Sequence, residues 1–411
     1  MRKILVSAYG CEPYKGSEQA VGWNIVLQLA QHNEVHVITR ANNCGPIESF
    51  LANCDRNYIH LHFHYYDTSK KILSLKNKEK GVYMYYILWQ IGIIGLARRL
   101  QKQFNFDYSF HLTFGSIWLP TFLFLLPPTF IWGPLGGGEA IPDSFIKTLS
   151  TKGQLLQYLR KILLLSIYVN PIILLPARKA KVLLCRTNDT INVFPKVFRR
   201  KCRILTDGAI ESEIFSLKRK DEDKNKEYVT LIVTSRLIHT KNIETIIRAV
   251  ELLSEDLPYR LRIVGSGPDE HHLKQLVTSL GLLNRVEFIS ALPRNEVFSY
   301  LSSSDIYLFA SLKEACNLSL LEAMAIGLPI ICLNWTGMAI STDDSCAIRL
   351  PVTNPEQMPK DMAAAIIKLI ENPELRKRMG DAGRKRIKEV FNWEAKGLFM
   401  ERLFAELDSK R

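Results

Sequence analysis

The sequence lacks any cysteine pattern that would cross-link a fold or bind zinc. Its 411 residues include eight cysteines, none in a CxxC pair and none near histidines at zinc-site spacing. We interpret them as reduced, mostly buried thiols, and expect neither a disulfide framework nor a metal site. Hydrophobic residues make up 47% and charged residues 23% of the chain, which excludes collagen-like and disordered classes. At this length more than one hydrophobic core is expected.

The sequence also lacks an uninterrupted apolar run long enough to span a bilayer. Three shorter runs occupy residues 82–97, 116–132 and 162–176, and none reaches the roughly 18–20 clean apolar residues that a spanning helix needs. Basic residues flank the first and third runs: Lys70, Lys71, Lys76, Lys78, Lys80, Arg98, Arg99, Lys102, Arg160, Lys161, Arg178, Lys179 and Lys181. This pattern is typical of helices that lie in the headgroup region of a membrane. The alternative is that the runs form core helices with solvated ends.

Acidic residues are scarce in the first half of the chain. Residues 1–206 contain 26 Lys and Arg against 11 Asp and Glu, a net +15, whereas residues 207–411 contain 28 against 30, a net −2. A basic half is attracted to polyanions, and its apolar runs favour an anionic membrane surface over nucleic acid. The first residues, MRKILVSAYG, do not have the shape of a signal peptide. We therefore expect a cytoplasmic protein attached peripherally to the inner face of the cell membrane.

The sequence pattern alternates strands and helices twice. The first series has strands at 4–9, 34–40, 59–66 and 108–114 and a helix at 17–31. A mixed-charge run at 218–227 follows and is interpreted as a linker; its acidic triplet 221–223 is not expected to bind metal. The second series has strands at 228–236, 259–267, 285–290, 305–311 and 328–334 and helices at 242–253, 270–281 and 318–327.

This order predicts an α/β protein with two Rossmann-like domains facing each other across a deep cleft. We place the boundaries at 1–206 and 207–391, and expect a C-terminal helix at 392–411 to pack back on the first domain. Ligands of such folds bind beyond the carboxyl ends of the strands. The loops after the strands are therefore the candidate site.

The loop 235–242, after the strand 228–236, is a candidate phosphate site. Arg236 ends the strand and Lys241 stands at the mouth of the next helix. Two cations beside free helix-terminal amides suit a diphosphate. The alternative is a solvated charged loop.

The loop 313–322, after the strand 305–311, carries two carboxylates. Glu314 lies in the loop and Glu322 one turn into the next helix. Carboxylates placed there can accept hydrogen bonds from sugar hydroxyls, while the amides around 316–319 face an anion. An isolated pair of glutamates would more often be surface charge.

Taken together, these motifs resemble the retaining family 4 glycosyltransferases, which have the GT-B fold (glycosyl transferases group 1). The resemblance rests on S-R-x4-K from Ser235, IVGSGPDEHHL at 263–273, E-x7-E followed by AMAIGLPII at 323–331, and FNWE at 391–394. At the N-terminus GSEQAVGW at 16–23, HLTFGS at 111–116 and WGPLGGGE at 132–139 are also similar to that family.

The resemblance implies a role for each matching residue. Arg236 and Lys241 would hold the donor diphosphate, Glu314 the sugar hydroxyls and Glu322 the ribose, with His111 close to the transferred sugar. The other expected donor-binding residues are Gly16, Ser17, Ser235, Gly265, Cys316, Asn317, Leu318 and Ser319; the expected acceptor-side residues are Gly136, Gly137, Gly138 and Glu139.

One departure concerns the family's E-G-x-G loop, where this chain has Ala315 and Asn317 in place of the two glycines. Since asparagine tolerates a left-handed backbone, we expect the loop still to form and the sugar preference to be affected more than activity.

The implied reaction transfers a hexosyl or related sugar from a nucleotide-diphosphate donor with retention, without a metal or other cofactor and without an enzyme nucleophile. The expected acceptor is a saccharide, lipid-linked, in the biosynthesis of a bacterial surface polysaccharide such as lipopolysaccharide or capsule. Two alternatives remain: a GT-B sugar-nucleotide epimerase, and a non-catalytic, membrane-docked binding module.

Overall fold

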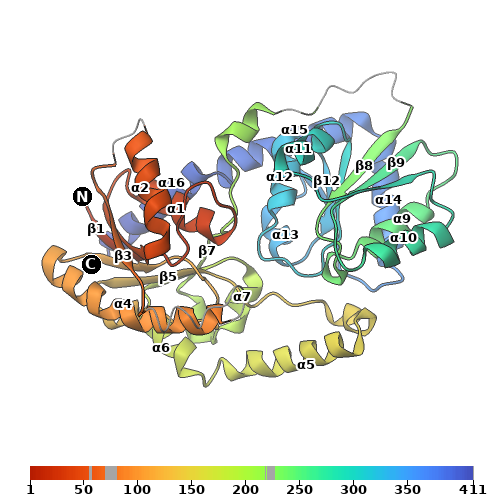
Figure 1. Ribbon diagram of the computed structural model, residues 1–411. Helices are drawn as coiled ribbons and strands as arrows, with labels where there is room; N and C mark the ends of the chain where they lie inside the picture. The colour runs from red at the N-terminus through yellow and green to blue at the C-terminus, as the bar shows by residue number, and fades with distance from the viewer. Residues whose placement is uncertain (55–57, 70–80, 218, 220–226, 411) are drawn as a thin grey trace. The chain divides into compact units, whose positions relative to one another are not determined.

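The computed structural model describes residues 1–54, 58–69, 81–217, 219 and 227–410. Two compact units are present (Figure 1). Unit 1 contains residues 1–138, 163–207 and 393–411, and unit 2 contains residues 139–162 and 208–392.

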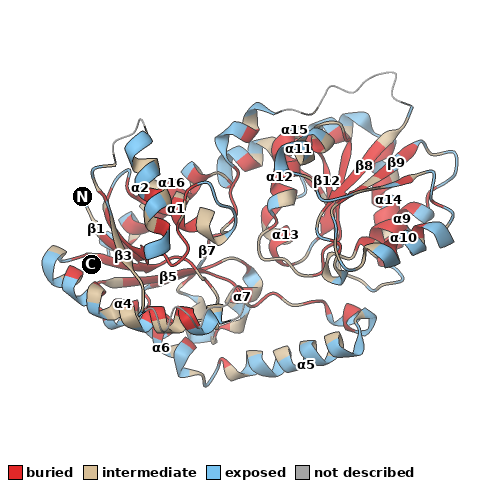
Figure 2. Ribbon diagram, viewed as in Figure 1, coloured by how far each residue is buried: buried red, intermediate tan, exposed pale blue. Residues whose placement is uncertain are grey.

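Unit 1 is built on a seven-stranded parallel sheet of order β3-β2-β1-β4-β5-β6-β7. Its strands are β1 Lys3–Ser7, β2 Glu34–Arg40, β3 Leu61–Tyr66, β4 Tyr108–His111, β5 Thr129–Leu135, β6 Val182–Cys185 and β7 Cys202–Ile204. The central strands are buried along almost their whole length (Figure 2). Because both faces of these strands are buried, their sequences are continuous runs of apolar residues and do not alternate between apolar and polar residues.

Helices cover both faces of this sheet. The helices α1 (Glu18–Leu29) and α16 (Trp393–Asp408) pack together on one face, and α4 (Val82–Phe104) and α6 (Pro171–Lys179) cover the other (Figure 1). The shorter elements are η1 Ala41–Asn43, α2 Cys44–Asn53, η2 Leu123–Leu125, α7 Asn188–Val193 and α8 Lys196–Arg199. The C-terminal helix α16 thus belongs to unit 1. Its Glu401 accepts a hydrogen bond from Asn33 Nδ2 at 2.6 Å and pairs with Arg2 at 2.8 Å.

Unit 2 is built on a six-stranded parallel sheet of order β10-β9-β8-β11-β12-β13. Its strands are β8 Val229–Thr234, β9 Tyr259–Val264, β10 Val286–Ile289, β11 Ile306–Phe309, β12 Ile330–Leu333 and β13 Ala347–Leu350. Its helices are α9 Ile243–Glu251, α10 Glu270–Ser279, α11 Arg294–Ser302, α12 Leu318–Ile326, α13 Thr336–Ser341, α14 Met358–Ile370 and α15 Pro373–Val390, with short turns η3 Asp143–Thr148, η4 Ser212–Ser216 and η5 His239–Lys241. The expected α/β fold with two Rossmann-like sheets is confirmed.

One segment belongs to a different unit from the one expected. Residues 139–162 were expected in the first domain, but they cluster with residues 208–392. Ile141 and Phe145 are buried in the core of unit 2, and Trp335 Nε1 donates to Ala140 O at 3.0 Å. The division between the units falls inside α5 (Thr151–Ser166). Of the mixed-charge run, residues 218 and 220–226 lie outside the described residues, as do Lys70, Lys71, Lys76, Lys78 and Lys80.

The three apolar runs have different structures. Run 82–97 lies within α4, which buries Tyr85, Tyr86, Trp89 and Ile93, so it is a core helix. Run 116–132 contains η2 and the start of β5, and run 162–176 contains the end of α5 and much of α6. Among the described helices, none alone has the length and hydropathy to cross a bilayer, although α5 and α6, bent by 49°, meet that test as a pair.

Candidate active site

The order of the strands selects one point in each sheet where a ligand can bind. In unit 2 the direction of winding reverses between β8 and β11, and in unit 1 between β1 and β4. At such a switch point the loops after the two strands diverge and leave a crevice beyond their carboxyl ends. In unit 2 these are the loops with Arg236 and Glu314, and in unit 1 those with Gly16 and His111.

The two loops of unit 2 are joined to each other. Leu312 N donates to Thr240 O at 2.8 Å, and Ser311 Oγ lies 3.2 Å from the same carbonyl oxygen. The loop after β8 turns into α9 through Asn242, whose φ is 53°, a left-handed conformation that asparagine tolerates.

Gly265 lets the end of β9 pack closely against the loop after β8. A Cβ on Gly265 would lie 1.9 Å from Ser235 O, and its φ is 142°. The predicted donor-binding residues Ser235 and Gly265 are therefore in direct backbone contact. In this structure Gly265 acts on the site by shaping the loop that carries Arg236.

Lys241 and Glu314 form the centre of the site in unit 2. Their side chains are in direct contact, and both are largely buried, with exposed fractions of 18% and 12%. Glu314 Oε1 also accepts from Ser311 Oγ at 2.8 Å. With its amide oriented to donate, Asn317 reaches Glu314 Oε2 at 3.3 Å. Two hydrogen-bond donors and a cation thus hold the carboxylate at the end of β11.

Arg236 differs from Lys241 in its surroundings. It is exposed, and among the described residues its guanidinium makes no hydrogen bond or ion pair. A free cation beside a fixed one leaves charge available for a polyanionic ligand.

The N-terminus of α12 supplies free amides next to this cluster. Leu321 N donates to Asn317 O at 3.0 Å, so the amides of Leu318, Ser319 and Leu320 have no partner within the helix. Such amides, with the helix dipole, favour an anion. Cys316 lies in the same loop, and its Sγ packs against Gly208, where a Cβ would come within 2.0 Å of it.

The expected left-handed backbone in this loop is wrong. Asn317 has φ −120° and ψ 74°, and Ala315 is not among the residues with positive φ. The close approach that this loop needs is provided by a different residue, Gly337, where a Cβ would meet Ala315 O at 2.6 Å. Replacement of the family's two glycines is therefore tolerated without backbone strain.

Glu322 is paired with an arginine that sequence reasoning missed. Its Oε1 accepts from Arg294 Nε at 2.8 Å, and Arg294 also pairs with Glu211 at 3.0 Å. Burial raises the pKa of Glu322, and the positive charge of Arg294 opposes that rise. No spacing in the sequence relates residues 294 and 322.

Glu139, expected on the acceptor side, belongs to unit 2. It is 5% exposed. Burial lowers the pKa of both Lys313 and Arg160, and the negative charge of Glu139 opposes that change. Arg160 Nη2 also donates to Glu139 O at 2.6 Å. A buried carboxylate with two cations therefore lies next to the loop that carries Glu314.

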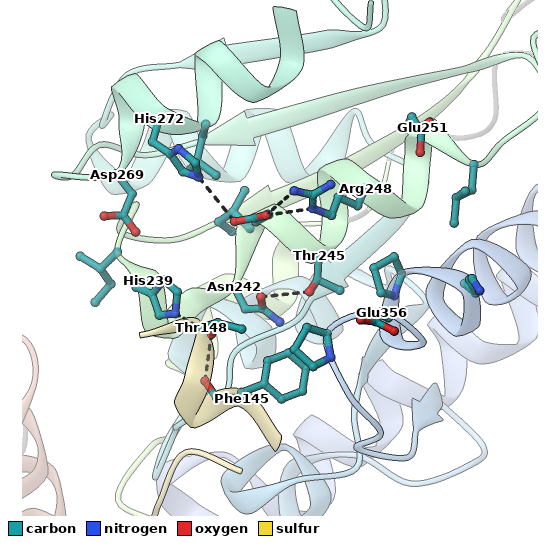
Figure 3. Close-up of a pocket in the computed structure, with 18 residues that line it drawn as sticks. Phe145, Thr148, His239, Asn242, Thr245, Arg248, Glu251, Asp269, His272 and Glu356 are labelled. Atoms are coloured by element: carbon teal, nitrogen blue, oxygen red, sulfur yellow. Dashed lines mark hydrogen bonds and ion pairs between the residues drawn. The ribbon is translucent and has the colours of Figure 1, made fainter. Parts of the chain in front are cut away.

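A separate cavity of about 540 Å³ opens beside η5 and α9, and it includes none of the predicted site residues. Figure 3 shows Thr148 and His239 facing each other across its edge, 3.1 Å apart, and Asn242 beside Thr245. Its lining carries both signs of charge, with Glu244 bonded to Arg248 at 2.8 Å. We assign no ligand to it.

In unit 1 the glycine-rich loop leads into α1. Residues 14–17 are exposed, and Ser17 has φ 58° and ψ −135°, a strained conformation for a residue with a side chain. Nothing lies within 4 Å of a Cβ placed on Gly16. The space in front of Gly16 is therefore open to a ligand, and the expected donor-binding role of Gly16 stays a prediction.

A charged network that sequence reasoning missed supports this loop. Glu18, the first residue of α1, accepts from Arg186 Nη2 at 3.0 Å and from Phe114 N at 3.0 Å. Arg186 also pairs with Asp207 at 2.9 Å. Arg186 directly follows β6, and a charged residue at the end of a strand was the signal in the sequence that could have marked it as a site residue.

The glycine segment 136–138 is shaped by close contacts. A Cβ on Gly136 would meet Arg186 at 3.2 Å, and one on Gly138 would meet Thr190 Cα at 2.5 Å. Gly137 has φ 122°. These residues directly follow β5 in unit 1, and Gly136 forms an isolated parallel bridge with Ser116.

His111 ends β4 and is buried, with an exposed fraction of 1%. Its Nε2 lies 3.3 Å from Tyr86 Oη, and Tyr86 donates to Pro120 O at 3.0 Å. Since that hydroxyl proton is used, Nε2 donates and Nδ1 carries the lone pair, which has no partner among the described residues. Burial lowers the pKa of His111 to about 3, so the ring is neutral.

A small cavity of about 150 Å³ lies at the carboxyl ends of β1 and β2 in unit 1. The rings of Tyr9 and Phe114 line it with Arg40 and Gln19. Arg40 stacks on Tyr9 at 5.0 Å. Aromatic faces beside planar polar groups are suited to a saccharide.

One further cluster could hold a metal ion. Ligand atoms of Glu34, His36 and His62 lie within 4.8 Å of one another. His36 already has both ring nitrogens paired, with Glu34 at 3.1 Å and His64 at 3.0 Å. The cluster includes Glu34, the first residue of β2, and lies away from the switch point, so we assign it no part in the reaction.

Both sheets match the GT-B fold along the whole chain. The lipopolysaccharide outer core galactosyltransferase WaaB aligns with a TM-score of 0.62 at 13% identity, covering 98% of this chain and 99% of that one. Anabaena HepE in complex with UDP and glucose aligns with a TM-score of 0.54 at 15% identity, covering 100% of both chains. The expected GT-B fold is confirmed.

Residues 215–386, which lie within unit 2, match the family described as glycosyl transferases group 1. This part of the chain is similar to that family, and the resemblance to the glycosyl transferases group 1 drawn from the sequence is confirmed.

Two curated relatives of this chain are also named as glycosyltransferases. An uncharacterized glycosyltransferase of Methanocaldococcus jannaschii is 33% identical over 193 residues, which are 46% of this chain and 48% of that protein. An MMP α-(1→4)-mannosyltransferase of Mycolicibacterium hassiacum is 26% identical over 167 residues, 40% of each chain. The matched segments span less than half the length of these relatives.

Proposed function

We propose that this protein is a retaining glycosyltransferase. It transfers a hexosyl or related sugar from a nucleotide-diphosphate donor to a lipid-linked saccharide at an anionic membrane surface, in the biosynthesis of a surface polysaccharide. The observation that carries the proposal is the cluster at the β8–β11 switch point: Lys241 bonded to Glu314, free Arg236 and the open N-terminus of α12. HepE, a protein of the same fold, was solved with UDP and glucose.

In the proposed reaction unit 2 holds the donor. Arg236, Lys241 and the amides of α12 neutralise the charge that develops on the leaving diphosphate, which is the role that a divalent cation has in other transferases. Glu314, fixed by Lys241 and Ser311, accepts hydrogen bonds from the donor sugar. Glu322 is left with Oε2 for the ribose, while Arg294 stabilises its charge.

Unit 1 is proposed to bind the acceptor. The cavity bounded by Tyr9, Phe114 and Arg40 has the chemistry for a saccharide. In the expected retaining mechanism the acceptor hydroxyl attacks the anomeric carbon on the face from which the diphosphate leaves, and the leaving phosphate takes the hydroxyl proton. No side chain is then needed as a nucleophile or as a base.

The test is incubation of the protein with radiolabelled nucleotide sugars and a bacterial lipid extract. Label in the lipid phase supports transfer, isomerised donor would instead mean an epimerase, and absence of both with every donor would contradict the proposal. Lys241→Ala serves as the inactive control.

The same assay tests the expected independence from metal. Because the cations at the diphosphate site are side chains, treatment with a chelator should leave turnover unchanged. Loss of activity that added magnesium restores would show that a metal takes part.

A further inference from the structure

Helix α5 is covered by almost none of the protein. No residue of its sixteen is buried, and Figure 2 shows it exposed or half-exposed along its length. Its exposed side chains include Leu155, Leu156, Tyr158, Leu159, Ile162 and Leu165. The most exposed are Leu165, at 70%, and Ile162, at 64%.

The exposed apolar surface continues through the turn into α6. Tyr168 and Val169 in the turn are 53% and 78% exposed. Helix α6 buries Ile173 and Ala177 in the core of unit 1, whereas Ile172 and Leu175 face outward. Helix α6 thus fixes one end of α5 to unit 1.

A helix with this composition needs a partner surface. Short helices gain most of their stability from packing of an apolar face, and α5 has almost no such packing within its own chain. Soluble proteins also rarely expose a contiguous apolar patch larger than a few hundred Å². Helix α5 therefore presents an apolar surface that the described residues leave uncovered.

The charges of this region identify the partner. Residues 144–188 contain eight Lys and Arg and no Asp or Glu. Apolar side chains interspersed with cations suit the interface of an anionic bilayer. A second copy of the chain would bring the exposed cations of this face, among them Lys152, Arg178 and Lys179, against one another, which disfavours a symmetric dimer through it.

We propose that α5 and α6 dock the protein on an anionic bilayer, with the exposed apolar side chains of α5 and the turn inserted among the headgroups. This deepens, and rests on, the proposed function, because it names the surface that brings the enzyme to a lipid-linked acceptor. The helices lie in the interface and do not span it. Sixteen residues of α5 extend about 24 Å, less than the hydrocarbon core, and a spanning position would bury Arg160 and Lys161 in it.

The experiment is flotation of the full chain with vesicles of phosphatidylcholine alone and of phosphatidylcholine with phosphatidylglycerol. The wild type should float with the anionic vesicles. The variant Leu155→Ser, Leu159→Ser, Ile162→Ser should bind them at least about tenfold more weakly, given the free energy of burying three large aliphatic side chains. The matched control Leu252→Ser, Leu283→Ser, Val390→Ser alters exposed apolar residues elsewhere and should bind like the wild type.

Four outcomes would overturn the inference. One is a wild type that stays with the soluble fraction, and another is a triple variant that floats equally well. The third is a wild-type dimer, seen by light scattering, that the α5 variant converts to monomer, because a second copy would then cover the face. Resistance to alkaline carbonate would also overturn it, because the helices would then be integral.

Donor hydrolysis in solution separates this inference from the proposed function. If both hold, the α5 variant keeps the wild-type rate of donor hydrolysis and loses transfer to lipid. If the protein floats as expected but neither hydrolyses nor transfers any donor sugar, the docking surface stands and the proposed function fails.

Discussion

At the residue scale, the contact between Lys241 and Glu314 carries most of the proposed chemistry. Each side chain is largely buried, and each stabilises the other in the absence of ligand. In the proposed reaction the donor diphosphate approaches a lysine that is already positioned, which lowers the cost of ordering Lys241 during the reaction.

Replacing Lys241 by alanine should lower turnover by on the order of 10²–10³-fold, the scale of losing one preorganised electrostatic contact. Steady-state rates measure the loss, and circular dichroism checks that the variant is folded. Lys274→Ala, which removes an exposed lysine from α10, is the control. Unchanged turnover in Lys241→Ala would remove Lys241 from the site.

The two glutamates should differ in what they affect. Glu322→Gln should mainly weaken binding of the free nucleoside diphosphate, because ribose contacts are equal in the ground and transition states. Glu314→Gln should mainly slow transfer, because contacts with the reacting sugar change during the reaction. Calorimetry with the diphosphate and rates with the donor separate the two. Equal losses of diphosphate affinity would contradict this division.

The buried histidines should make the protein sensitive to acid. Burial lowers the pKa of His36, of His64 to about 4 and of His111 to about 3, against 6.5 in the unfolded chain. Below pH 6.5 the unfolded state binds protons that the folded state does not, so stability falls as the pH is lowered toward 4. Melting temperatures from pH 7 to pH 4 measure this. His64→Gln should show a shallower decline, and an equally steep one would exclude His64 as a source.

At the element scale, the site depends on close contacts at the ends of strands. The loop after β8 passes over Gly265 at the end of β9 so closely that no side chain fits. The loops after β8 and β11 are then joined by the hydrogen bond from Leu312 to Thr240. These contacts place Arg236 and Glu314 at one switch point.

Gly265→Ala should therefore destabilise unit 2 by about 2–4 kcal/mol, through both steric overlap and a disfavoured φ. Gly281→Ala is the matched control, because Gly281 has a φ of 70° but no atom within 4 Å of the added Cβ. Gly281→Ala should lower the free energy of unfolding by only about 1 kcal/mol. Chemical denaturation measures both, and equal effects would mean that the contact with Ser235 is relaxed at little cost.

At the scale of the whole molecule, the chain forms two cores that are not continuous in sequence. Residues 139–162 leave unit 1 to complete unit 2, and residues 393–411 return to unit 1. The family match covers only residues 215–386, so the segments that cross between units come from outside it.

This division predicts that the two units unfold in separate transitions. Phe145→Ala removes a ring buried in unit 2, and Phe194→Ala one buried in unit 1. Each substitution should lower the free energy of unfolding of its unit by about 3–5 kcal/mol. In scanning calorimetry the two variants should therefore lower the midpoint temperatures of different transitions. A shift of the same transition by both variants would show that the units unfold together.

Much of this organisation could be predicted from the sequence by itself. The strands and helices that were expected lie at nearly their observed positions, because the apolar periodicity that defines them is local, whereas β5, β6, β7 and β13 were not expected. The positions of Arg236, Lys241 and Glu314 after strands followed from that alternation, since parallel strands present their following loops on one edge. The roles assigned to these residues remain predictions.

Only the tertiary structure decided which distant groups meet and which apolar surfaces are covered. The pairs Glu322–Arg294 and Glu18–Arg186 join residues far apart in the chain, and the sequence contains no spacing that relates them. The runs 82–97 and 162–176 have similar composition, yet α4 is buried against the sheet while most of α5 and the turn after it are exposed. Burial depends on what the rest of the fold places against a helix, and a local sequence pattern carries no information about that partner.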